Sequence, residues 1–204
     1  MTSAAHPILA ELDTALSQAP ASWHVTVLRR ITDLFIANAE LYGEDQVALF
    51  GDVMCRLIAK ADRVALAELS AKLAPVVNAP AKALDRLARH PDIAVSGPLL
   101  EFAAALPDED LVAIADTDRA DLRLLAKIAA RAQLSAAVTD VLLKRGNRAI
   151  QRKVIDNPFA CISEVGFARL INGLNGDKDL AAAIGARQDV PRELRMWLDA
   201  ALSK

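Results

Sequence analysis

Four short stretches of the chain read almost alike, and each has the pattern of the last turn of a helix. They are residues 87–90, 128–131, 154–157 and 184–187. Each ends an apolar, periodic segment with a polar or cationic residue, and a Pro or a capping Ser follows within a few positions. Successive stretches begin 41, 26 and 30 residues apart, which is near the period of helical repeats. The pattern therefore predicts helices that are stacked in chain order.

Apolar residues recur at steps of three and four through nearly the whole chain, and the alternation typical of strands is absent. We therefore expect an all-α fold of about a dozen short helices, whose packing angles, which the sequence does not determine, decide between a right-handed array and a globular one. Such short helices are marginal alone and need their neighbours to stay folded. We expect an N-terminal helix (7–18) and linker over residues 1–21, and a helical-repeat domain over residues 22–204.

Capping residues indicate where helices should begin, because their side chains can accept hydrogen bonds from otherwise unpaired N–H groups. We expect caps at Ser22, Ser135, Asn147, Ser163 and Asp177. Gly146 follows two cations, so we expect it to take the left-handed conformation that ends many helices.

Three further local patterns predict structure in the chain. Asp118 and Asp121 resemble a capping box that opens a helix. Pro98 is expected near the first turn of a helix over about Val95 to Leu106, where proline is tolerated. Arg29 and Asp33 lie one helical turn apart and favour a surface ion pair.

Several of these segments together resemble a known bacterial family. They are Arg-Ile-Thr-Asp-Leu-Phe at 30–35, Val-Ala-Leu-Phe-Gly-Asp-Val at 47–53, the stretches 87–90 and 95–100, and residues 138–146. The chain, from about Trp23 to its C-terminus, resembles the family catalogued as domain of unknown function 2336, which is similar to HEAT-like and leucine-rich-variant helical repeats. The resemblance implies a helical-repeat architecture, a right-handed superhelical array like a HEAT-type α-solenoid, and a bacterial, cytosolic origin. It implies no reaction and provides no catalytic residues.

Charge is unevenly distributed although the whole chain has a net charge of only −2. Residues 101–121 contain seven acids and one base, whereas residues 122–155 contain eight bases and one acid. This reversal of sign suggests where a charged partner could bind.

Five cations in the second segment are the candidate partner-binding residues: Arg123, Lys127, Arg131, Arg148 and Arg152. The first three step by four, as do the last two, so each set is expected to form a stripe on one helix face. Equivalent positions of stacked repeats line one surface, so the two stripes could form a basic face for an acidic protein segment, a phosphate or a nucleic acid. The alternative is a solvated exterior whose cations interact with helix ends and nearby acids.

The most plausible function from the sequence is a non-enzymatic protein-interaction or regulatory scaffold that binds its partner through this charged face. Binding of nucleic acid or a phosphate ligand is the alternative. An isoelectric point near 5.9 and only eight aromatic residues count against nucleic acid. An enzyme comes third, since distant residues can assemble a catalytic site that no local motif shows.

No catalytic, cofactor-binding or metal motif stands out in the sequence. Asp116 and Asp118 have the first spacing of a calcium loop, but Ala120 stands where a third ligand is needed. His6, His24 and His90 are too dispersed for a zinc pattern, and His90 is expected to anchor a helix end. We therefore expect no cofactor and no metal.

The two cysteines and the hydropathy pattern point to a cytoplasmic protein. Cys55 and Cys161 are too few and too distant for a disulfide framework, and we expect inert packing groups. No apolar run is long enough for a membrane span. Glu11 and Asp13 interrupt the N-terminal apolar stretch, so a secretory signal is not expected.

Overall fold

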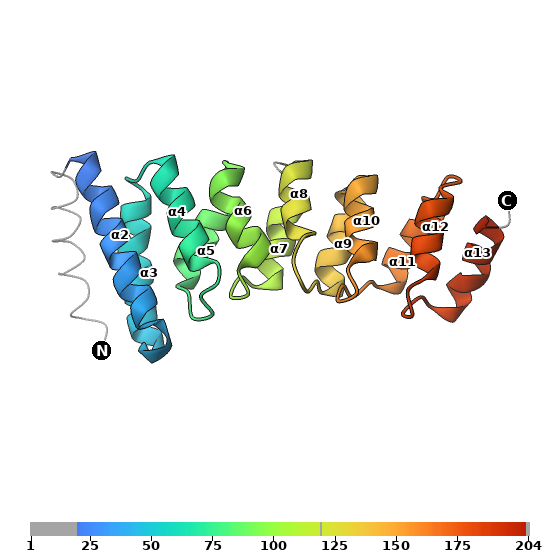
Figure 1. Cartoon of the computed structure of the whole chain (residues 1–204), viewed down its shortest axis with the longest axis horizontal. Helices are drawn as coiled ribbons and strands as arrows, with labels where there is room; N and C mark the ends of the chain where they lie inside the picture. The colour runs from blue at the N-terminus through green and yellow to red at the C-terminus, as the bar shows by residue number, and fades with distance from the viewer. Residues whose placement is uncertain (1–19, 119, 203–204) are drawn as a thin grey trace. The chain divides into compact units, whose positions relative to one another are not determined.

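The computed structural model describes residues 20–118 and 120–202, and these residues fold into helices (Figure 1). They form twelve α-helices and one 3-10 helix, and one isolated bridge between Leu134 and Ala160 is the sole β-type pairing in the described part of the chain. The expectation of an all-α chain is confirmed. The helix expected over residues 7–18 lies outside the described residues.

The chain divides into two compact units, Met1–Leu106 and Pro107–Lys204, which are called unit 1 and unit 2 below. Residues 22–204 therefore contain a division at Leu106 that we did not expect. The boundary expected near residue 21 stays a prediction.

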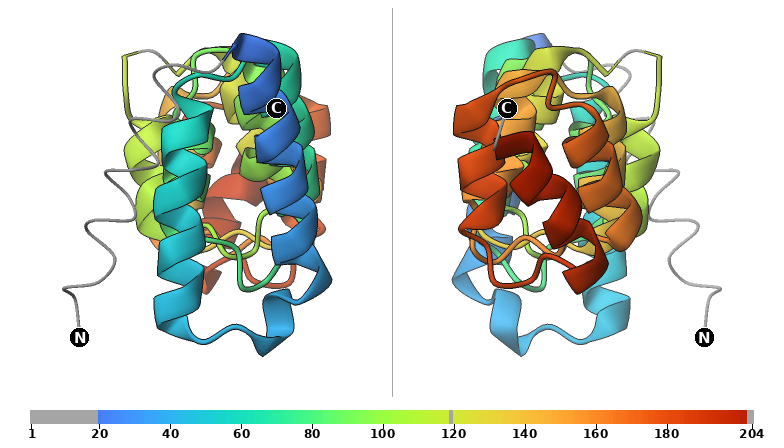
Figure 2. Two further views of the ribbon diagram at one scale, coloured as in Figure 1. Left: turned by 90° about the vertical axis from the view of Figure 1, so that its left-hand side faces the viewer. Right: turned by 90° about the vertical axis from the view of Figure 1, so that its right-hand side faces the viewer.

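Unit 1 holds its helices in two layers. Its elements are α2 (Ala21–Ala37), the 3-10 helix η1 (Ala39–Leu41), α3 (Glu44–Ile58), α4 (Arg63–Leu73), α5 (Ala81–Ala88) and α6 (Ile93–Phe102). Helix α4 packs against α2 and α6, whereas α3 packs against α2 and α5. Figure 2, left, shows α2 and α3 side by side, one from each layer.

Unit 2 repeats this arrangement with shorter helices. Its elements are α7 (Asp108–Ala115), α8 (Leu122–Ile128), α9 (Ala136–Arg145), α10 (Arg148–Asp156), α11 (Glu164–Asn172), α12 (Lys178–Gly185) and α13 (Arg192–Leu202). Helix α9 packs against α7 and α11, and α11 packs against α13. Helix α10 packs against α8 and α12, which form the other layer, and Figure 2, right, shows α12 beside α13.

The cores of both units consist mainly of Leu, Ala, Val and Ile, as the composition requires. In unit 1 the phenylalanine at the centre is Phe35, which is fully buried, and in unit 2 it is Phe167. Burial of such side chains provides the main driving force for packing helices that are too short to be stable alone.

Most of the expected caps are confirmed. The side chains of Ser135, Asn147, Ser163 and Asp177 each accept a hydrogen bond from the N–H three residues further on, at 3.4, 3.1, 2.9 and 2.9 Å. His90 also anchors a helix end, because its Nδ1 accepts a hydrogen bond from the N–H of Asp92 at 3.1 Å.

Three expected starts are wrong. Helix α2 begins at Ala21, one residue before Ser22, and Pro20 precedes it without a side-chain cap. Helix α8 is capped by Asp121, which accepts from the N–H of Leu124 at 2.9 Å, so Asp118 is not its cap. Helix α6 begins at Ile93 after the cap Asp92, so Pro98 lies in the interior of the helix. In each case the residue at the cap position lies two or three residues from the expected one.

Gly146 has an extended backbone, with φ −76° and ψ 156°, so the expected left-handed conformation is wrong. A Cβ at this position would lie 2.5 Å from the carbonyl oxygen of Leu142 and 2.7 Å from Cγ2 of Ile150. Glycine is therefore required by close packing between α9 and α10. Left-handed backbone occurs at Asn175 and Gly176, with φ 48° and 82°.

The ion pair expected between Arg29 and Asp33 is also wrong. Arg29 of α2 bonds to Glu68 of α4 at 2.8 Å, and Asp33 accepts from Lys72 of α4. Both charged residues of α2 therefore form ion pairs with α4, because the two helices pack against each other.

Candidate interaction surfaces

Arg148 connects α10 to the C-terminal end of α11. Its Nη2 donates to the carbonyl oxygens of Gly173 and Leu174, at 2.6 and 2.9 Å, and its Nε lies 3.3 Å from a carboxylate oxygen of Asp177. A cation is favourable beside carbonyl groups that have no partner within their own helix. Arg148 of α10 thus contacts the end of α11 and the start of α12. A side chain with these contacts is not freely accessible to a partner.

Arg152 lies one turn further along α10 and pairs with Asp156 at 2.8 Å. This hydrogen bond to the carboxylate raises the pKa of the Arg152 guanidinium. Its Nη1 also donates to the carbonyl oxygen of Asp179 in α12, at 3.4 Å. The side chain is about half exposed.

The stripe expected for Arg123, Lys127 and Arg131 is only partly formed. Arg123 and Lys127 lie on α8, but the helix ends at Ile128, so Arg131 lies in the turn that follows. Arg131 is partly buried, and burial lowers the pKa of its guanidinium. Arg123 bonds to Asp121 at 2.9 Å while 77% of its side chain remains exposed.

Helix α8, which carries Arg123 and Lys127, packs against α10, which carries Arg148 and Arg152. Arg123, Arg148 and Arg152 bond to nearby acids or helix ends, which are the contacts that a solvated exterior would show. The most exposed of these three is Arg123.

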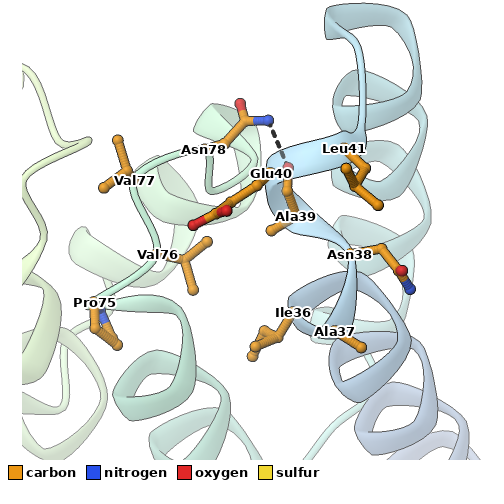
Figure 3. Close-up of a pocket in the computed structure, with 10 residues that line it drawn as sticks. All are labelled: Ile36, Ala37, Asn38, Ala39, Glu40, Leu41, Pro75, Val76, Val77 and Asn78. Atoms are coloured by element: carbon orange, nitrogen blue, oxygen red, sulfur yellow. Dashed lines mark hydrogen bonds between the residues drawn. The ribbon is translucent and has the colours of Figure 1, made fainter.

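A second surface lies in unit 1, and the sequence reasoning missed it. A groove of about 920 Å³ lies between the turn after α2 and the turn after α4 (Figure 3). Its lining residues are Ile36, Ala37, Asn38, Ala39, Glu40, Leu41, Pro75, Val76, Val77 and Asn78. Leu41 and Val77 are 80% and 82% exposed, which is unusual for such apolar side chains.

The Asn78 amide joins the two walls of the groove. Its Nδ2 donates to the carbonyl oxygens of Ala39 and Tyr42, at 3.0 and 3.2 Å, and the first of these bonds is drawn in Figure 3. The wall that holds η1 is supported from behind by three aromatic rings, since Tyr42 lies 5.8 Å from Phe35 and 5.0 Å from Phe50 between ring centroids. The groove is therefore preformed.

The groove offers binding groups and few catalytic ones. Its lining contains one ionisable side chain, Glu40, and two amides, Asn38 and Asn78. Figure 3 shows Ile36 and Val76 on opposite sides of the gap, with Glu40 extending between the two walls. A sequence signal for this surface exists in Pro75-Val76-Val77-Asn78, an apolar turn without charge between two helices.

Elsewhere in the described part of the chain, no three His, Cys, Asp or Glu side chains are grouped so that they could hold a metal ion. Among the described helices, none has both the length and the apolar character needed to cross a membrane.

Comparison with protein families decides the classification of the chain. Residues 95–204 match the profile of the family described as uncharacterised protein conserved in bacteria, DUF2336. The chain belongs to the DUF2336 family. The match begins at Val95, later than the resemblance expected from Trp23, so it covers most of α6 and all of unit 2 while the groove lies before it. Comparisons with curated proteins and with solved structures gave no match.

Proposed function

We propose that this DUF2336 protein is a non-enzymatic interaction or regulatory scaffold of the bacterial cytoplasm that binds another protein. The observation that supports the proposal is the groove of unit 1. Leu41 and Val77 remain about four-fifths exposed although hydrogen bonds and aromatic packing fix both walls around them. Exposed apolar side chains on a rigid, concave surface are typical of protein-binding sites.

The helical arrangement supports a HEAT-like repeat architecture for each unit. Helices alternate between two layers, and α10, for example, packs against the helices two places before and after it in the chain. Stacked helix pairs of this kind provide extended binding surfaces in repeat proteins.

A second contact surface is proposed on unit 2. Of the five cations expected to bind a partner, it includes Arg123, Lys127 and Arg152. Arg148 is left out because its guanidinium is bonded to the end of α11, and Arg131 is left out because it is partly buried in the turn after α8. These three side chains suit an acidic protein segment.

Nucleic acid or a phosphate ligand is the alternative occupant of the same cations. Such binding depends steeply on salt, because phosphate contacts release counterions. Titration of a fluorescent random-sequence duplex at low and at moderate salt tests it, and absence of binding at low salt would exclude this alternative.

The scaffold proposal is tested by affinity capture from a bacterial lysate, followed by mass spectrometry. The full-length protein is compared with a groove variant, Leu41→Ser with Val77→Ser, and with a cation variant, Arg123→Glu. Val64→Ser and Lys60→Glu are the matched controls, since Val64 is 60% exposed on α4 and Lys60 is an exposed cation of unit 1.

We expect at least one protein that the wild type and both controls retain and that one of the two surface variants loses. Identical sets of captured proteins for all five forms would refute both surfaces. Thermal midpoints of the variants should stay within a few degrees of the wild type, because the substituted side chains are mostly exposed.

A further inference from the structure

We infer, on the basis of the proposed scaffold function, that the groove of unit 1 binds a basic segment of a partner protein, in which Lys or Arg flanks an aliphatic or aromatic side chain. The apolar lining of the groove is the reason to expect an aliphatic or aromatic side chain in the partner. Leu41 and Val77 are open to solvent, and Ile36 and Val76 are partly exposed beside them. An aliphatic or aromatic side chain that enters between the walls would remove all four from water.

The charges around the groove are the reason to expect Lys or Arg in the partner. Residues 34–46 and 73–81, which include the groove lining and the positions that flank it in the chain, contain three acids and no Lys or Arg. The acids are Glu40, Glu44 and Asp45. Among the described residues, Glu40 has neither a hydrogen-bonding nor an ion-pairing partner, so its carboxylate is available to a ligand.

The nearest cations along the chain do not compensate these acids, because they bond elsewhere. Lys72 bonds to Asp33, and Lys82 bonds to Asp52 at 2.7 Å. The same hydrogen bond raises the pKa of the Lys82 ammonium group.

Two helix ends add to the negative potential. Helix α2 ends at Ala37 and α4 ends at Leu73, so the carbonyl ends of both helices adjoin the groove lining. The last turn of α2 contains no basic residue, and the basic residue in the last turn of α4 is the paired Lys72. The C-terminal end of a helix favours a nearby cation.

Charge also argues against the other occupants of the groove. Residues 1–19 of the same chain include Glu11 and Asp13 but no Lys or Arg. A second copy would bring the same acids face to face across a symmetric contact, which like-charge repulsion disfavours. An acidic peptide or a nucleic acid is repelled for the same reason.

The test uses the full-length protein and a phage library of random twelve-residue peptides. Selected peptides are synthesised, and their dissociation constants are measured by fluorescence polarisation at low and at moderate salt. The variants are Leu41→Ser with Val77→Ser for the apolar contact and Glu40→Lys for the charge. Val64→Ser is the control, because Val64 is a similarly exposed apolar residue of unit 1 outside the groove.

We expect the selected peptides to contain at least two Lys or Arg beside a large apolar residue. Their affinity should fall at least tenfold in the Leu41/Val77 variant and in Glu40→Lys, and should be unchanged in Val64→Ser. Salt should weaken the binding. No enrichment of peptides, enrichment of acidic peptides, or equal affinity for all variants would overturn the inference.

Two further measurements identify a competing occupant. Peptide binding that appears only after deletion of residues 1–19 would assign the groove to that segment, and a dimer that the Leu41/Val77 variant abolishes would assign it to a second copy. Either result overturns the inference. The capture experiment could find a partner that depends on the groove while the selected peptides are not basic. In that case the proposed scaffold function holds, and the inference that the groove binds a basic segment is wrong.

Discussion

The side-chain amide of Asn157 donates a hydrogen bond to the carbonyl oxygen of Arg131, with 2.9 Å between nitrogen and oxygen. The carbonyl oxygen of Asn157 accepts in turn from Nη1 of Arg187 at 2.8 Å. These three residues hold the same position at the ends of three of the four similar stretches in the sequence. The ends of successive helix pairs in unit 2 are thus joined in series, and the likeness of the stretches reflects a shared contact.

Arg187 makes the most demanding of these contacts, and its loss should destabilise unit 2. Its side chain is only 9% exposed, and it donates to the carbonyl oxygens of Ile155 and Ala160 as well as that of Asn157. Arg187→Met should lower the free energy of unfolding by about 3 kcal/mol, because three partly buried carbonyl acceptors lose a charged donor. Urea denaturation followed by circular dichroism measures the change.

Arg192→Met is the control, because Arg192 is an exposed cation at the start of α13. Its effect should stay within about 0.5 kcal/mol. Equal losses for the two variants would show that the carbonyl contacts of Arg187 contribute little.

Gly146 should be intolerant of any side chain because of its neighbours. Gly146→Ala is expected to cost about 2 kcal/mol, since its Cβ would overlap the Leu142 carbonyl oxygen and Ile150. Gly146→Asn should be at least as harmful, whereas a left-handed glycine would accept Asn more readily than Ala. Thermal and urea denaturation compare these forms.

Gly185→Ala is expected to have the opposite effect on stability. Gly185 is helical, and a Cβ there would meet Leu198 at 3.5 Å, an ordinary contact. The substitution should therefore stabilise the protein by about 0.5 kcal/mol through helix propensity. A stabilising effect of alanine at both glycines would contradict the packing explanation.

The candidate cations should separate into structural and exposed residues. Arg148→Ala should lower the free energy of unfolding by about 2 kcal/mol, because the carbonyl oxygens of Gly173 and Leu174 lose a charged donor. Arg123→Ala should change it by no more than about 0.5 kcal/mol, since its pair with Asp121 is on the surface. Denaturation by urea distinguishes the two, and similar effects would refute the division.

Asp121 should contribute to the loss of stability in acid. The backbone N–H of Leu124, and next Arg123, hold the pKa of its carboxyl below the usual range. The folded state thus binds this proton less readily than the unfolded state, so the contribution is complete above the unfolded pKa near 3.9 and is lost as the pH falls through the lower folded value.

Asp121→Asn and Asp121→Ser keep a cap for α8 but carry no charge. For both variants the difference in unfolding free energy between pH 6 and pH 3 should be smaller than in the wild type. The measurement is urea denaturation at the two pH values. An unchanged difference would mean that the Asp121 charge is not linked to folding.

The sequence was informative wherever structure depends on a few adjacent residues. Ser135, Asn147, Ser163 and Asp177 were predicted as caps because each contact involves the residue and the N–H three positions later. The position of Gly146 between two helices was also predicted, but its conformation was not. The reason for that glycine is its contact with the side chain of Ile150, which depends on the angle between α9 and α10.

Contacts between distant segments were beyond prediction from the sequence. Arg148 reaches residues 25 and 26 positions away, and Asn78 reaches Ala39 across 39 positions. Helix packing decides such pairs, so the candidate cations could be found as a group while their bonding partners could not. The groove was missed for the same reason, because its two walls come from separate turns.

The two walls of the groove are joined by hydrogen bonds from the side-chain amide of one residue, Asn78. Aspartate is nearly the same size but has no hydrogen to donate, so at this position it would face two carbonyl oxygens with a third acceptor. Replacement of one NH₂ group by an oxygen atom could separate the walls while every helix of unit 1 stays folded.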